Sequence, residues 1–128
     1  MTHERIATDG APRALGPYAQ AVVAGEIVFC AGQIGLDPAT GRLVAGGTAL
    51  ETARALENLT AVLAAAGLGL ADVVKTTVFV VDLREFATLN EIYGRYFRPP
   101  YPARSTVQVA ALPAGARVEI EAIAVRGR

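Results

Sequence analysis

Short apolar segments, separated by polar turn residues, recur along most of the chain. Residues 18–34, YAQAVVAGEIVFCAGQI, hold two segments rich in β-branched and apolar residues around a turn at positions 24–26. This pattern predicts two strands joined as a hairpin. Residues 73–81, VVKTTVFVV, are β-branched almost throughout and too few for a typical buried helix. They predict a further strand that is apolar on both faces.

Two longer segments show helical periodicity. From position 53 to 66, apolar residues recur at intervals of three and four, and Thr48 and Glu51 precede them at the spacing of a capping box. A second stripe follows Asp82 and Glu85, which repeat that spacing, and it ends before the proline pair at 99–100. Asn90 sits beside this second stripe.

The last part of the chain, residues 101–125, has two β-rich segments around a Pro-Ala-Gly turn, which predicts a second hairpin. A short strand is expected at residues 4–7. The order β-β-α-β-α-β-β predicts an α+β fold, in which a mixed sheet of five to six strands carries two helices on one face. At 128 residues, a single domain spanning positions 1–128 is expected.

Two helices can cover only one face of such a sheet, yet several predicted strands are apolar on both faces. Leaving several hundred Å² of apolar surface in water would forfeit on the order of 10 kcal/mol, comparable to the stability of a domain. The composition points the same way, because 52% of the residues are hydrophobic. We therefore expect a homo-oligomer whose sheets pack face to face.

Charge and composition exclude several classes of function. Twelve basic and twelve acidic residues give a net charge of zero, without a basic run, so no nucleic-acid partner is expected. No apolar stretch has the length of a membrane span, and the N-terminus lacks the pattern of a signal peptide, so we expect a cytoplasmic protein without a membrane partner. With one cysteine, Cys30, and one histidine, His3, no metal site is expected. Cys30 lies in an apolar run and is predicted to be a buried, inert thiol.

The remaining candidates for chemistry include Arg104, Glu119, Tyr18, Gln33 and Asn90. An arginine can grip a substrate carboxylate with two parallel hydrogen bonds, and a nearby glutamate can take a proton from water. The spacing alone favours the simpler interpretation of an exposed arginine at a strand end and a solvent-facing glutamate. It does not show that the two side chains meet.

Taken together and in order, the segments GPYAQA, AGQIGLDPATG, VVKTTVFVVDL, FATLNEIYGRYF, YPARSTVQVAALP and VEIEAIAV resemble the RidA/YjgF family of reactive-imine deaminases. The resemblance extends from about residue 6 to residue 125. It implies a fold like that of bacterial chorismate mutase, assembled as a homotrimeric barrel with clefts between subunits. It also implies cofactor-free hydrolysis of 2-imino acids, such as 2-iminopropanoate and 2-iminobutanoate, to 2-keto acids and ammonia.

The resemblance assigns roles to individual residues. Arg104 in PARS corresponds to the arginine that binds the substrate carboxylate, and Glu119, the first glutamate of VEIE, to the residue that holds the attacking water. Tyr18 in GPY and Asn90 in FATLN correspond to residues that line the cleft. Arg104, Glu119 and Tyr18 are therefore the expected catalytic residues, with Asn90 in substrate binding.

Gly32, Ala31 and Thr106 complete the expected substrate-binding set, partly through backbone groups. Three positions depart from the family pattern, because Ala31 replaces a common Ser or Thr, Thr106 a common Cys, and Gly35 a usual Pro. Loss of one hydroxyl would change a rate by about tenfold, which tunes activity without abolishing it. The departures leave open a non-catalytic trimer that binds small carboxylates for regulation. A ribonuclease or translation inhibitor, as other members have been described, is the third alternative.

Overall fold

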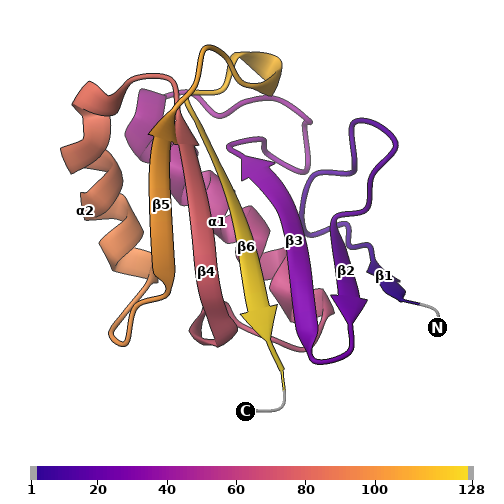
Figure 1. The fold of residues 1–128 in the computed structure, drawn as a ribbon. Helices are drawn as coiled ribbons and strands as arrows, with labels where there is room; N and C mark the ends of the chain where they lie inside the picture. The colour runs from indigo at the N-terminus through magenta and orange to yellow at the C-terminus, as the bar shows by residue number, and fades with distance from the viewer. Residues whose placement is uncertain (1–2, 127–128) are drawn as a thin grey trace.

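The computed structural model describes residues 3–126, which form one six-stranded sheet with two α-helices packed behind it (Figure 1). The strands are β1 (Glu4–Ile6), β2 (Ala21–Ala24), β3 (Ile27–Ile34), β4 (Val73–Val80), β5 (Ala103–Gln108) and β6 (Val118–Val125). The helices are α1 (Gly47–Ala65) and α2 (Phe86–Tyr96), and the 3₁₀ turns are η1 (Leu70–Asp72), η2 (Leu83–Glu85) and η3 (Pro113–Gly115). The predicted α+β class, the mixed sheet and the two helices on one face are confirmed.

The strands lie in the order β1-β2-β3-β6-β4-β5; within residues 3–126, β4 and β5 pair in parallel and the other neighbouring strands pair antiparallel. The predicted hairpin of β2 and β3 and the short leading strand β1 are both present. The predicted hairpin at the end of the chain is wrong, because β4 lies between β5 and β6. The helical connection through α2 brings β5 back parallel to β4 along its outer side, so the last two strands never become neighbours.

The main core lies between the sheet and the two helices. Its fully buried side chains come from α1 and from the central strands: Val28, Leu56, Leu59, Leu63, Val78, Val118 and Ile120. Cys30 belongs to this core, and burial raises the pKa of its thiol to about 11. A thiol that remains protonated at neutral pH is a poor nucleophile, as predicted for this residue.

The predicted capping box of α1 is wrong. The helix begins after Gly46, which adopts a left-handed conformation with φ 116°, and no side chain caps it. Thr48 and Glu51 are buried instead and bond to residues far away in the sequence, Glu85 and Arg117. The sequence has the spacing of a capping box, but both side chains form tertiary hydrogen bonds instead of capping the helix.

The opposite face of the sheet is not covered by either helix and is turned toward the viewer in Figure 1. It carries large exposed apolar side chains, among them Ile27, Phe29 and Val107, which are 39%, 45% and 42% exposed. Within residues 3–126, no helix has the length and apolar character that crossing a membrane requires. Oligomerisation through the uncovered face stays a prediction.

Candidate functional site

Glu119 lies near the start of β6, where its side chain rises from the uncovered face of the sheet. It pairs with Ile34 on β3 and with Phe79 on β4. The register of β3 against β6 shifts between Cys30 and Gln33, and this irregularity brings Gly32 under the carboxylate. A Cβ atom at position 32 would come within 2.7 Å of Glu119 Cδ, so the carboxylate occupies the space that any other side chain would need.

Burial raises the pKa of the Glu119 carboxyl above its usual value, and the negative charge of Glu121 raises it further. Both carboxylates lie on the same face, two residues apart on β6. A carboxylate with a raised pKa is a stronger base at neutral pH than an ordinary surface glutamate. This property suits a group that takes a proton from water.

Glu119 lines a pocket of about 250 Å³, which we call the Glu119 pocket. Its residues come from the loop before β2, from the end of β3 and from the loop before β6: Pro12, Arg13, Leu15, Gly16, Pro17, Tyr18, Gln20, Gly32, Gln33, Ile34, Leu36, Pro113 and Glu119. The Tyr18 hydroxyl accepts a hydrogen bond from Leu15 N at 3.0 Å. Its own hydrogen can therefore be donated to a ligand.

Arg104 lies on the edge strand β5, and its guanidinium packs on two aromatic rings of α2. The distances from Arg104 Cζ to the ring centroids are 4.8 Å for Tyr93 and 5.5 Å for Phe86. The Tyr93 hydroxyl is in turn hydrogen-bonded to Thr76 on β4 at 2.7 Å. Stacking on the faces of the rings orients the guanidinium and leaves its N–H groups at the ring edges available to an anion.

Arg104 lines a second pocket of about 310 Å³, the Arg104 pocket, together with Asn90, Tyr93, Gly94, Tyr101 and Pro102. Asn90 is exposed on α2. Thr106 lies two residues beyond Arg104 on β5 and is half-buried. Ala31 is close to the other pocket, next to Gly32, and its backbone N–H donates to Gln20 O.

The structure therefore divides the candidate residues between two places. Arg104 pairs with Thr76, which faces the helices, whereas Glu119 pairs with Phe79, three residues further along β4 and on the opposite face. Tyr18, Gly32 and Glu119 share one pocket, while Arg104 and Asn90 share the other. Within one chain, Arg104 and Glu119 do not meet.

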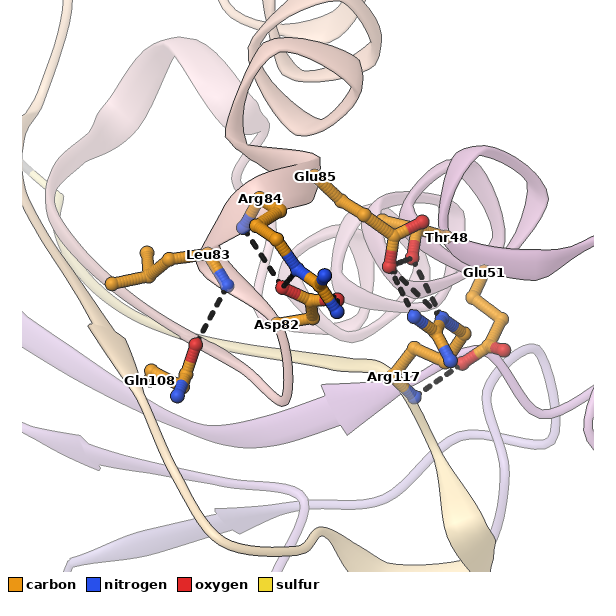
Figure 2. Close-up of polar contacts among 8 residues, drawn as sticks. All are labelled: Thr48, Glu51, Asp82, Leu83, Arg84, Glu85, Gln108 and Arg117. Atoms are coloured by element: carbon orange, nitrogen blue, oxygen red, sulfur yellow. Dashed lines mark hydrogen bonds and ion pairs between the residues drawn. The ribbon is translucent and has the colours of Figure 1, made fainter.

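A polar network holds the start of β6 in place (Figure 2). The Arg117 guanidinium forms an ion pair with Glu85, and its Nε also donates to Thr48 Oγ1 at 3.0 Å. The Thr48 hydroxyl donates to the same Glu85 carboxylate at 2.8 Å, and Arg117 N donates to Glu51 Oε1 at 2.8 Å. These bonds join η2, α1 and β6 two residues before Glu119.

On the other side of η2, Leu83 N donates to Gln108 Oε1 at 2.8 Å (Figure 2). This bond ties the end of β5 to the turn that leads into α2. Sequence reasoning missed Arg117, the two aromatic rings under Arg104 and the arginine that lines the Glu119 pocket, Arg13. Of these, only the rings had a sequence signal, since both belong to the apolar stripe of α2. Among residues 3–126, no cluster of three or more potential metal ligands is present.

Comparison with known proteins places these features in context. Residues 8–126 match the family model described as endoribonuclease L-PSP. The chain is 52% identical to the human protein named 2-iminobutanoate/2-iminopropanoate deaminase, over 95% of this chain and 89% of that protein.

Solved structures give the same picture. A putative endoribonuclease from Thermotoga maritima superposes with a TM-score of 0.95 at 52% identity, covering 98% of each chain. The crystal structure of E. coli TdcF with bound serine gives a TM-score of 0.93 at 47% identity, covering 97% of this chain and 99% of that one. Similarity of this extent fixes both the fold and the family.

Proposed function

Because the chain belongs to the RidA/YjgF family, described as endoribonuclease L-PSP, we propose that it hydrolyses 2-imino acids to 2-keto acids and ammonia without a cofactor. 2-Iminopropanoate, 2-iminobutanoate and their enamine tautomers are the proposed substrates. The observation that carries the proposal is Glu119, a carboxylate with a raised pKa over Gly32 in a pocket with Tyr18. The human relative, which is 52% identical and named 2-iminobutanoate/2-iminopropanoate deaminase, supports the same reaction.

The proposed site forms between two copies of the chain. Arg104 and Glu119 lie on opposite faces of the sheet, so a small substrate can touch both only if a neighbouring copy supplies one of them. The uncovered apolar face provides a surface for such an assembly. We propose a homotrimer in which the Arg104 pocket of one copy faces the Glu119 pocket of the next.

In this site, the Arg104 guanidinium binds the substrate carboxylate with two parallel hydrogen bonds, while Asn90 and Thr106 lie beside it. Glu119 accepts a proton from a water molecule as the water oxygen attacks the C=N carbon. Glu119 returns this proton to the imine nitrogen, which gives the neutral carbinolamine. Glu119 then takes the hydroxyl proton and passes it to the same nitrogen as the C–N bond breaks and the C=O bond forms, so that ammonia and the 2-keto acid are released. Tyr18 donates a hydrogen bond to the water or the substrate, and the backbone at Ala31 and Gly32 completes the lining.

An assay with a threonine dehydratase, which releases 2-iminobutanoate, tests the reaction. We expect the purified protein to accelerate the appearance of 2-ketobutyrate, and an equal concentration of Glu119→Gln to leave the rate at that of the dehydratase alone. The Glu119→Gln substitution keeps the size of the side chain and removes the basic carboxylate. An unchanged rate with the wild-type protein would refute the proposed activity.

The non-catalytic alternative has a specific observation in its favour, since Ala31 offers no hydroxyl next to Gly32. A regulatory trimer would bind 2-ketobutyrate, measurable by calorimetry, without accelerating imine hydrolysis. The ribonuclease alternative agrees with the family description, but the sequence has zero net charge and one histidine. We propose that the protein acts in the cytoplasm on small carboxylates rather than on RNA.

A further inference from the structure

Arg13 places a guanidinium at the Glu119 pocket, whereas Arg104 lines the other pocket. It lines that pocket with Tyr18 and Glu119, and its side chain is exposed. Among residues 3–126, this side chain forms no hydrogen bond or salt bridge. A solvated arginine at the surface would need no explanation, but this one lines the same pocket as the carboxylate proposed as the catalytic base.

The loop that carries Arg13 is fixed by a buried glutamine. Gln20 is 5% exposed, and its Nε2 donates to Pro12 O at 2.8 Å and to Thr8 O at 3.1 Å. Its Oε1 accepts from Thr8 N at 2.7 Å. Ala11 is also buried, at 3% exposure. The backbone immediately before Arg13 is therefore held in place, so the side chain extends from a defined point of the chain.

Arg13 does not neutralise Glu119. No salt bridge joins the two side chains, and the causes that raise the pKa of Glu119 are burial and Glu121. Arg13 also borders a neighbouring hollow that contains Arg5 and Asp9, without an ion pair to Asp9. Both residues thus line one pocket without an ion pair between them, and Leu15 and Leu36 contribute apolar side chains to its lining.

We propose that Arg13 determines substrate specificity by binding the second carboxylate of dicarboxylic 2-imino acids. The inference rests on the proposed function, in which Arg104 of a neighbouring copy holds the first carboxylate. Without Arg13, a second carboxylate would meet the apolar walls and the charge of Glu119, and both would disfavour it. The Arg13 guanidinium supplies the opposite charge and a matching pair of donors.

Competition between two substrate classes tests this role. The imines are formed in situ by amino-acid oxidases from glutamate and from alanine, and semicarbazide traps the imine that the protein has not hydrolysed. We expect Arg13→Gln to lower kcat/KM for the dicarboxylic imine about tenfold more than for the monocarboxylic one, the effect of one charge-assisted interaction. Arg13→Lys keeps the charge and should recover part of the ratio.

Arg5→Gln is the matched control, because Arg5 lies in the neighbouring hollow and does not line the Glu119 pocket. It should leave the ratio of the two substrates unchanged. An Arg13→Gln protein with the wild-type ratio, or a ratio that Arg5→Gln changes equally, would overturn the inference while the proposed function stands. Failure of the wild-type protein to hydrolyse either imine would instead overturn the proposed function.

A binding measurement tests the role of Arg13 whether or not the protein hydrolyses imines. In calorimetry, 2-ketoglutarate should bind the wild-type protein more tightly than 2-ketobutyrate, and Arg13→Gln should remove about tenfold of that preference. The preference should also weaken with added salt, because the guanidinium is exposed. Equal affinities for the two keto acids in the wild-type protein would contradict the inference.

Discussion

At the scale of single residues, Gly32 is required for the position of Glu119, because the Glu119 carboxylate fills the space that a side chain at position 32 would need. Gly32→Ala would push its methyl group into the carboxylate, so Glu119 would have to move from its position in the pocket. We expect kcat/KM for imine hydrolysis to fall by about a hundredfold, since a displacement of about 1 Å has effects of this size. Steady-state kinetics on purified protein measures it.

Gly69→Ala is the control for this substitution, because a Cβ atom at Gly69 has nothing within 4 Å and the residue has φ −134°. It should retain wild-type kinetics. Full activity of Gly32→Ala would show that the position of Glu119 seen here is not required for the reaction.

Glu121 provides a second test at this scale, through the pH dependence of the reaction. Glu119 acts as a base only when deprotonated, so activity falls as the pH decreases through its pKa. The Glu121 charge raises that pKa. Glu121→Gln should therefore move the acid limb of kcat/KM to lower pH. A pH–rate profile of both proteins measures the shift, and an acid limb that stays in place would argue against Glu119 as the titrating base.

At the scale of elements, the sequence predicted what local patterns encode. The hairpin of β2 and β3 has its turn signal between adjacent strands, and the structure shows that pairing. The last two strands carry a similar turn, but the preference of β5 for the outer side of β4 is a property of the whole sheet. Thr48 and Glu51 show the same limit, since their partners lie 37 and 66 residues away. The sequence did not predict that Arg104 and Glu119 lie on opposite faces, because their placement depends on how both strands pair with β4.

The packing of α2 on β4 depends on a buried polar pair, Thr76 and Tyr93, whose hydroxyls are 2.7 Å apart. Thr76→Val leaves the Tyr93 hydroxyl buried without its partner and should lower the free energy of unfolding by about 1–3 kcal/mol. Tyr93→Phe should have a smaller effect in the Thr76→Val background than in the wild type, because neither partner is then left unpaired.

Urea unfolding of the four proteins, at one protein concentration, measures this coupling. The Tyr93 ring also lies under Arg104, so the same pair fixes the surface on which the guanidinium rests. Strictly additive effects would mean that the two hydroxyls stabilise the protein independently.

At the scale of the whole molecule, the separation of Arg104 and Glu119 determines how many copies of the chain a shared site would need. Each chain carries an arginine on the helix-covered face and a base on the uncovered face, with β4 between the strands that bear them. In a closed trimer, each of the three sites would take Arg104 from one copy and Glu119 from the next. A site built within one chain would take both from the same copy. The two arrangements differ in what mixtures of defective chains can do.

Arg104→Ala and Glu119→Gln should each be inactive as pure proteins, yet equal amounts refolded or expressed together should regain activity. A trimer with both kinds of chain contains one junction where the intact arginine meets the intact glutamate, and three quarters of randomly assembled trimers are mixed. The expected recovery is therefore about one quarter of the wild-type rate. Mixing the folded proteins without exchange of subunits is the control and should stay inactive. A mixture that remains inactive after proven exchange would place both residues outside a shared site between subunits.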